Sequence, residues 1–93
     1  MLTAITNGPV SVAIQANQIG FQLYKKGVFS GACGTNLDHG VLAVGYGTLD
    51  GKPYYKVKNS WGGSWGDSGY ILMARKGDGK GQCGIQMAAT LPL

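Results

Sequence analysis

A histidine and an asparagine, each set in a dense local pattern, are the residues of this chain best suited to chemistry. His39 is the only histidine and lies in the segment Asn36–Val41, and Asn59 lies in a segment rich in tryptophan and glycine, residues 58–70. An imidazole titrates near neutral pH, so it can accept a proton and later return it. A neutral amide can accept a hydrogen bond from one ring nitrogen and hold the ring in place. The pair therefore predicts two members of a nucleophilic triad, the base and the group that orients it.

Two strands and a turn between the two residues predict that they lie side by side. An apolar run, residues 40–46, follows His39, and a second extended run, residues 53–59, ends at Asn59. Between them Asp50-Gly51 is a strong signal for a tight hairpin turn. An antiparallel hairpin brings the beginning of its first strand next to the end of its second. We therefore expect the His39 and Asn59 side chains to be within hydrogen-bonding distance.

The rest of the pattern predicts a mainly β fold. Val10, Val12 and Ile14 alternate with small or polar residues, which is the period of a half-buried strand. One or two helical turns are expected within residues 17–24, with Asn17 as N-cap. Further extended segments are expected at 27–29, 69–76 and 83–91, with turns at 31–35 and 77–81. Short strands separated by glycine-rich turns favour an antiparallel sheet or small barrel, and we expect one domain over residues 1–93.

Composition and charge exclude several other classes of protein. The chain has 93 residues, 44% of them hydrophobic and 13% charged, so it can bury a core and does not have the composition of a disordered tail. The net charge of +4 comes from scattered lysines, whereas nucleic-acid binding favours a clustered stripe. No apolar run is long enough to cross a membrane as a helix. No G-x-S-x-G motif precedes a helix, which gives a serine hydrolase little support.

The two cysteines, Cys33 and Cys83, allow two interpretations. Cys33 is close enough in sequence to His39 to suggest a Cys-His catalytic pair, and a disulfide between Cys33 and Cys83 is the alternative. A zinc site is not expected, because two cysteines and one histidine at these spacings fit no ligand pattern.

The motifs occur in an order that is similar to a known enzyme family. The chain resembles the C-terminal half of papain-like, cathepsin L-type cysteine proteases, over roughly residues 5 to 93. The matching pieces, in family order, are Asn7–Ile14, Cys33, Asp38-His39-Gly40, Val44–Gly47, Lys58–Gly62, Gly69-Tyr70 and Cys83-Gly84-Ile85.

The resemblance implies a fold, a reaction and a missing partner. Family C-terminal domains are antiparallel, β-barrel-like units with short peripheral helices. They pack against a helical N-terminal domain, which carries the catalytic cysteine and the oxyanion-hole glutamine and which we expect to be absent from this chain. His39 would be the general base, Asn59 the orienting amide and Trp61 the indole that shields their hydrogen bond. Cys33 and Cys83 match a family disulfide, so the resemblance favours their pairing.

The resemblance also implies a substrate pocket and a cellular setting. Positions that match the main specificity pocket are Ala13, Leu37, Gly40 and Ala88, with Asp38 at the rim. The expected partners are the cysteine-bearing domain or chain, polypeptide substrates, and also protein inhibitors and a propeptide. No cofactor or metal, nucleic acid or membrane is expected. The parent protein would be lysosomal, vacuolar or secreted, and the chain alone inactive; the alternative is a noncatalytic papain-like binding or structural module.

Overall fold

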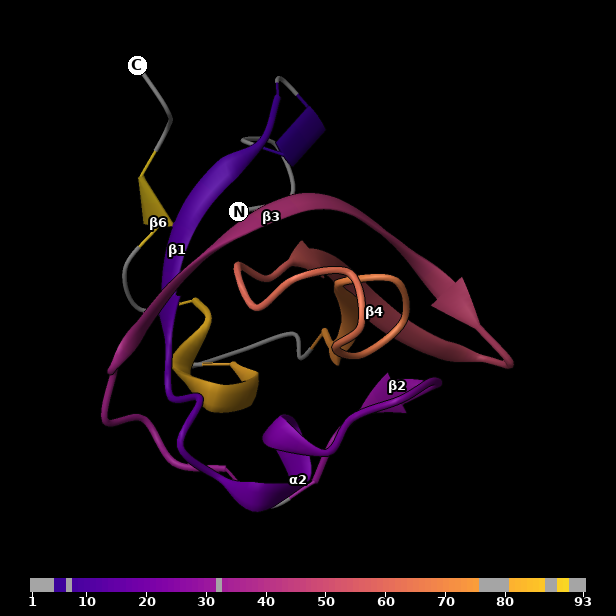
Figure 1. The fold of residues 1–93 in the computed structure, drawn as a ribbon. Helices are drawn as coiled ribbons and strands as arrows, with labels where there is room; N and C mark the ends of the chain where they lie inside the picture. Colours follow the sequence, from indigo (N-terminus) through magenta and orange to yellow (C-terminus); the bar gives the residue numbers. More distant parts are fainter. Residues whose placement is uncertain (1–4, 7, 32, 76–80, 87–88, 91–93) are drawn as a thin grey trace.

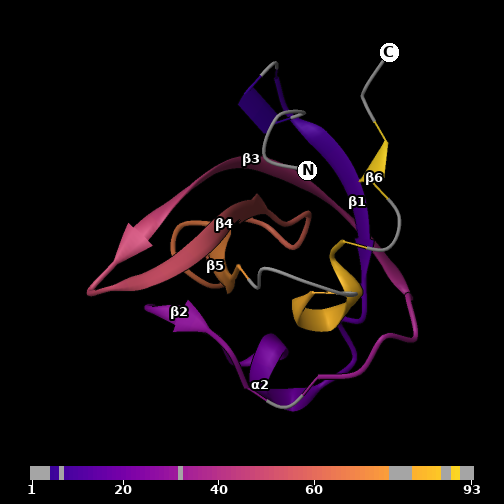
Figure 2. The same cartoon turned by 180° about the vertical axis from the view of Figure 1, so that it is seen from behind.

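One curved six-stranded sheet organises the chain in a computed structural model, which describes residues 5–6, 8–31, 33–75, 81–86 and 89–90. The strands are β1 (Val10–Ile14), β2 (Val28–Phe29), β3 (His39–Leu49), β4 (Lys52–Lys58), β5 (Tyr70–Ala74) and β6 (Ala89–Thr90). Their order across the sheet is β2-β5-β4-β3-β1-β6. The short helix α2 (Ile19–Gln22) and the 3-10 helix η1 (Gln82–Gly84) lie outside the sheet. Figures 1 and 2 show the long β3 curving along one side, with α2 and β2 at the opposite side. The mainly β prediction is confirmed.

The hairpin of β3 and β4 forms as the Asp-Gly signal predicts. Asp50 and Gly51 both have positive φ, 50° and 79°, as the two central residues of a type I′ turn require. Antiparallel pairing then runs from Leu49 opposite Lys52 to Leu42 opposite Lys58, with a bulge between Ala43 and Gly45. The strands cover 39–49 and 52–58, so the first extends further in both directions than expected.

The alternating pattern of β1 also has the predicted consequence. Val10, Val12 and Ile14 are buried on one face of the strand, while Ser11 and Ala13 are half-buried on the other. β1 pairs antiparallel with β3, and Ile14 lies opposite His39. The core on the inner face also includes aromatic and aliphatic side chains from distant segments: Phe21, Tyr24, Val41, Ala43, Tyr55, Val57, Ile71, Met73 and Ile85.

Three expectations about the smaller elements are wrong. Asn17 is not the N-cap of α2, because Gln18 occupies that position and makes no capping bond through its side chain. β2 pairs with β5 in parallel, so the sheet is mixed and open at its edges. The segment expected to be extended from Cys83 begins as η1, and only Ala89–Thr90 forms a described strand. Most of the expected turn at 77–81 lies outside the described residues.

The disulfide between Cys33 and Cys83 explains why η1 replaces a strand. The two Cα atoms are 5.0 Å apart, and Cys83 has a left-handed φ of 56°. The Gln82 side-chain amide donates to the Gly31 carbonyl at 2.8 Å. The Cys83 carbonyl accepts from the Gln15 backbone amide at 2.9 Å. These contacts to the segment 31–33 and to residue 15 hold the backbone in a compact turn. The disulfide is therefore the correct alternative for the two cysteines.

None of the helices in the described ranges is both long enough and apolar enough to span a membrane.

Removal of the disulfide should destabilise the domain strongly. The bridge closes a loop across a sequence separation of 50, which on the chain-entropy model corresponds to about 4 kcal/mol. We expect a Cys33→Ala/Cys83→Ala double variant to lose stability of this order in urea unfolding. Thiol titration of the unfolded, unreduced wild type should find no free sulfhydryl. A loss below about 1 kcal/mol, at the low end of measured disulfide effects, would contradict the structural role.

Gly66 should not tolerate a side chain, whereas its neighbour Gly63 should. Gly66 has φ 61°, and a Cβ there would lie 2.7 Å from the backbone carbonyl oxygen of Tyr70. We expect Gly66→Ala to cost about 1–3 kcal/mol, because the backbone must shift and the residue is strained. Gly63→Ala is the matched control in the same loop, since no atom lies within 4 Å of its Cβ position. Equal unfolding midpoints for the two variants would show that this contact is not restrictive.

Candidate active site

His39 and Asn59 are in direct contact, as the hairpin geometry predicts. His39 is the first residue of β3, and Asn59 follows the last residue of the neighbouring β4. The His39 Nε2 and Asn59 Oδ1 atoms are 2.6 Å apart, which is the length of a short hydrogen bond. The pair is part-buried, and only 5% of the Asn59 surface is exposed.

The surroundings of Asn59 determine which ring nitrogen of His39 carries hydrogen. Oδ1 of Asn59 also accepts a hydrogen bond from the Ser60 backbone amide at 2.7 Å, so this atom is the amide oxygen. An amide oxygen cannot donate a hydrogen bond, and therefore Nε2 of His39 must be the donor. In the neutral ring Nδ1 then has the free lone pair. The structure thus leaves Nδ1 as the nitrogen that can accept a proton.

Asn59 is held through its backbone as well as through its side-chain oxygen. Its backbone amide donates to the Gly69 carbonyl at 3.0 Å, which ties it to the end of the loop of residues 59–69. Its Nδ2 atom is buried and makes no hydrogen bond within the described part of the chain. The amide is therefore fixed through its oxygen and its backbone, while its buried nitrogen takes no part in holding it.

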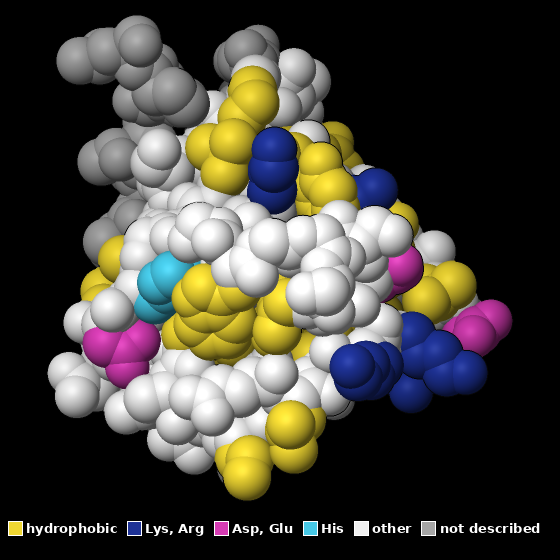
Figure 3. Space-filling model, in the orientation of Figure 1, with side chains coloured by type: hydrophobic (Ala, Val, Ile, Leu, Met, Phe, Trp, Pro, Cys, Tyr) yellow, Lys and Arg dark blue, Asp and Glu magenta, His cyan; other side chains and the backbone are white. Residues whose placement is uncertain are grey.

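An aromatic cluster covers the pair. The Trp61 ring lies 5.0 Å from the His39 ring, tilted by 31°, and its exposed fraction is 38%. Figure 3 shows the histidine at the surface with hydrophobic side chains directly beside it. The Trp61 indole therefore lies against the His39 ring; its shielding of the hydrogen bond stays a prediction. Trp61 in turn packs edge-on against Phe21 and Trp65, with ring centroids 5.6 Å and 5.3 Å away.

Phe21 belongs to this cluster although the sequence pattern does not single it out. Its side chain is fully buried, and it contacts the rings of Trp61, Trp65 and Phe29. The indole nitrogen of Trp65 donates to the Gln22 carbonyl at 3.0 Å, which fastens α2 to the loop. The only sequence signal for Phe21 is that it is an aromatic residue in a short helical segment. The role of Phe21 depends on contacts with residues some forty positions further along the chain.

Asp38 fixes the backbone directly before His39. Its amide donates to the Ile14 carbonyl at 2.9 Å, and its carboxylate accepts from the Ala16 amide at 2.8 Å. Both bonds attach the approach to β3 to the end of β1. Asp38 is exposed, so its carboxylate remains accessible beside the His39–Asn59 pair.

The residues expected to form a substrate pocket are only partly gathered. Ala13 lies opposite Gly40 in the β1–β3 ladder, and a Cβ on Gly40 would meet open space. Leu37 is half-buried just before Asp38. Ala88 lies outside the described residues.

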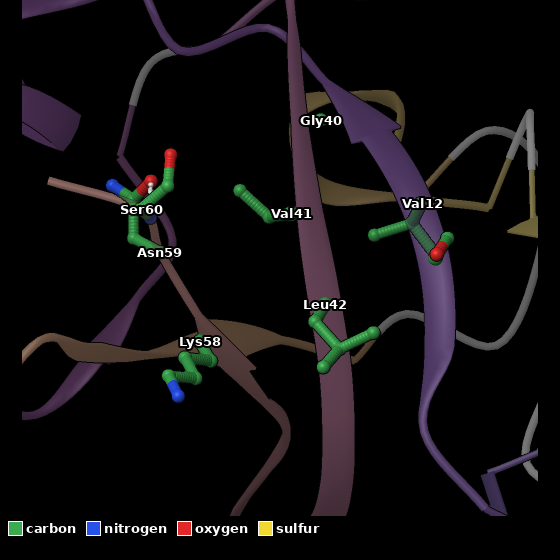
Figure 4. Close-up of a pocket in the computed structure, with 8 residues that line it drawn as sticks. Val12, Gly40, Val41, Leu42, Lys58, Asn59 and Ser60 are labelled. Atoms are coloured by element: carbon green, nitrogen blue, oxygen red, sulfur yellow. Dashed lines mark hydrogen bonds between the residues drawn. The ribbon is translucent and has the colours of Figure 1, made fainter. Parts of the chain in front are cut away.

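A shallow hollow of about 480 Å³ lies next to Asn59, and we call it the Asn59 hollow. Its lining residues are Ser11, Val12, Gly40, Val41, Leu42, Lys58, Asn59 and Ser60. Figure 4 shows Asn59 and Ser60 on one side of it and Val12 on the other, with β3 between them. Of the expected pocket residues that the structure describes, Gly40 alone is among those that line it.

The two cysteines take no part in this site. Both are in the disulfide, so the alternative in which Cys33 pairs with His39 as a nucleophile is wrong. No group of three or more His, Cys, Asp or Glu side chains within the described ranges could hold a metal ion.

Comparisons with known proteins agree on one family. A family model described as papain family cysteine protease matches residues 1–93. A probable cysteine protease RD21B from Arabidopsis thaliana is 58% identical over 91 residues, which are 97% of this chain and 20% of that protein. Vignain from Ricinus communis is 57% identical over 95 residues, covering 100% of this chain and 26% of that protein. The chain thus spans about a fifth to a quarter of the length of these relatives.

Solved structures give the same result. The bromelain protease from Ananas comosus, in complex with the E64 inhibitor, superposes with a TM-score of 0.93 at 50% identity, over 99% of this chain and 43% of that one. The ragweed pollen allergen Amb a 11, a cysteine protease in its proform, gives a TM-score of 0.94 at 42% identity, over 99% of this chain and 29% of that one. By the family model, the sequence identities and the fold, this chain belongs to the papain family of cysteine proteases.

Proposed function

We propose that this chain supplies the general base and the orienting amide of a cysteine endopeptidase. The observation that carries the proposal is the 2.6 Å bond between His39 Nε2 and Asn59 Oδ1, which leaves Nδ1 free to accept a proton. Both cysteines of the chain are in a disulfide, and a disulfide sulfur cannot attack a carbonyl as a thiolate. The nucleophile therefore comes from outside residues 1–93, from a domain or chain that completes the enzyme.

The proposed reaction is acyl transfer through a thioester. His39 Nδ1 takes the proton of the cysteine thiol, and the imidazolium formed stabilises the thiolate. The thiolate attacks the peptide carbonyl carbon, the C–N bond breaks, and the imidazolium gives its proton to the departing amine. Water, with its proton accepted by His39, then hydrolyses the thioester and releases the acid. The Asn59 oxygen keeps the ring plane and tautomer constant, and the Trp61 indole reduces water access to the His39–Asn59 bond, which strengthens it.

The Asn59 hollow is the part of the surface on which we propose that the cysteine-bearing domain docks. It lies beside the pair, its floor is the sheet, and Leu42 and Lys58 present partly or fully exposed side chains at its walls. A domain seated there would lie next to Asn59, the residue that orients the His39 ring. Two solved relatives support further partners. The bromelain protease is in complex with the E64 inhibitor, and Amb a 11 is in its proform. We infer that the complete protein likewise binds inhibitors and its own propeptide.

Substrate selection is proposed to favour an apolar residue immediately before, on the amino side of, the residue whose carbonyl is cleaved. Ala13 and Gly40 are small residues opposite each other, with open space above Gly40. Leu37 adds an apolar wall, and Asp38 lies at the rim. Ala88 is assigned to the same pocket from the family resemblance alone. The disulfide suits an oxidising compartment, so we propose a vacuolar, lysosomal or secreted enzyme.

Substitution of either member of the pair should impair the complete enzyme. We expect His39→Gln to lower kcat/KM by about 10²–10⁴, the usual contribution of a general base. Asn59→Ala should lower kcat and change the pH profile while KM changes little, because it alters the orientation of the ring and not substrate binding. Asn36→Ala, an exposed residue of the approach loop, is the control. If His39→Gln keeps more than half of the activity, or the nucleophile position holds Ser or Gly, the noncatalytic alternative holds instead.

The isolated chain should not hydrolyse peptides. It has no free thiol, and the donors expected to stabilise the oxyanion, which are worth about 10²–10³ in rate, belong to the other domain. We expect no thiol-dependent turnover of a peptidyl fluorogenic substrate by purified residues 1–93. Turnover that requires reductant and disappears in both Cys33→Ser and His39→Ala would overturn the assignment.

A further inference from the structure

A second hollow lies beside the beginning of β5, and we call it the tyrosine hollow. Its volume is about 420 Å³, which lies within the range of small-ligand sites. It shares no lining residue with the Asn59 hollow. The lining residues come from β4, β5, the turn before β5 and the segment after α2: Tyr24, Tyr54, Lys56, Asp67, Ser68, Tyr70, Ile71 and Leu72.

Tyr24 forms a fixed wall of the hollow. Only 6% of its surface is exposed, its hydroxyl donates to the Gly27 carbonyl at 2.6 Å, and it accepts from the Leu72 amide at 3.3 Å. Burial raises the pKa of the Tyr24 phenol, and the two hydrogen bonds of the hydroxyl anchor the ring. The hollow thus has a wall whose shape is set by β2 and β5 before any ligand arrives.

The turn before β5 carries two polar side chains to the rim. Two backbone hydrogen bonds between Asp67 and Tyr70, at 2.9 Å and 3.0 Å, close this turn. Ser68 between them has a left-handed φ of 54°, a conformation that costs energy for a residue other than glycine and that concentrates at functional sites. Both the Asp67 and Ser68 side chains are exposed.

Two opposite charges face the hollow without neutralising each other. The Lys56 ammonium lies 5.0 Å from the centre of the Tyr70 ring, and no ion pair joins it to the Asp67 carboxylate in the described part of the chain. Each charge attracts a ligand of opposite sign as well as repelling one of like sign, so the two charges together select for neither sign. A neutral ligand rich in hydroxyl groups is opposed by neither charge, because each hydroxyl can both donate to a carboxylate and accept from an ammonium.

We propose that the tyrosine hollow binds a neutral saccharide of one or two pyranose rings. The apolar C–H face of the sugar packs on the exposed part of Tyr54, a rigid and amphipathic surface, because the Lys56 ammonium lies over the Tyr70 ring. Its hydroxyls donate to Asp67 and accept from Lys56 and Ser68. The site is separate from the proposed catalytic chemistry, so its test does not depend on peptidase activity.

The test is a titration of the complete protein that contains this chain, followed by NMR. The probes are N,N′-diacetylchitobiose, the core of protein-linked glycans, and maltose, a free storage sugar; choline and glucuronate are the charged comparisons. We expect saturable shifts of the Tyr54, Lys56 and Tyr70 signals with a neutral disaccharide. Stronger binding of chitobiose would indicate a glycoprotein source for the ligand, and stronger binding of maltose a free one.

Matched variants test the contacts. Asp67→Asn keeps the shape of the rim and should weaken binding about tenfold, because it removes a charge-assisted hydrogen bond. Asp50→Asn, in the hairpin turn and outside the hollow, should not change binding. Lys56→Ala should also weaken binding, and Lys52→Ala is its control. These two lysine variants leave Tyr70 unchanged, so they remain informative if a variant at Tyr70 fails to fold.

Three results would overturn the proposal. The first is an absence of saturable shifts with either disaccharide up to its solubility limit. The second is a set of shifts that centres on His39 and Asn59. The third is tighter binding of choline or glucuronate than of both disaccharides, which would make the hollow a site for a charged ligand.

Discussion

The antiparallel register between β3 and β4 is the constraint on which the site depends. Leu42 lies opposite Lys58, and this places His39 and Asn59 at the same end of the ladder, where their side chains meet. Because side chains alternate across a strand, a slip of one residue would turn Asn59 to the other face and break the bond. The turn at Asp50 and Gly51, in which both residues have positive φ, fixes the register at the far end of the hairpin. The relative position of His39 and Asn59 is thus set by this turn together with the bulge between Ala43 and Gly45, which shifts the register by one residue.

The register alone does not hold the two side chains in place, and non-local contacts provide the rest. The Cys33–Cys83 bridge restricts the segment that leads to His39, and Asp38 attaches its last residue to β1. On the other side, Phe21 and Trp65 support the Trp61 indole from beneath. All of these contacts except that of Trp61 with Trp65 join segments far apart in sequence, so the pair is fixed by the folded domain and not by its own hairpin only.

This division between local and non-local contacts explains which features the sequence could predict. The hairpin, the alternation of Val10, Val12 and Ile14 and the meeting of His39 with Asn59 follow from turn chemistry and strand period, which are local. The parallel pairing of β2 with β5 and the 3-10 turn at Gln82–Gly84 could not be predicted in this way. The bond from Gln82 to Gly31 joins residues whose proximity only the complete fold creates. Family motifs gave the disulfide and the role expected of Trp61, but they gave no sign of the tyrosine hollow.

The segment from Asn59 to Tyr70 serves two sites with different parts of its structure. Toward the candidate active site it contributes the side chains of Asn59 and Trp61 and the Gly69 carbonyl that accepts from the Asn59 backbone amide. Toward the tyrosine hollow it contributes the side chains of Asp67, Ser68 and Tyr70. Side chains of the turn can therefore be exchanged without removing the hydrogen bond that fixes Asn59, as long as the backbone conformation is kept. A backbone shared in this way lets surface recognition vary while the geometry of the histidine and its amide stays constant.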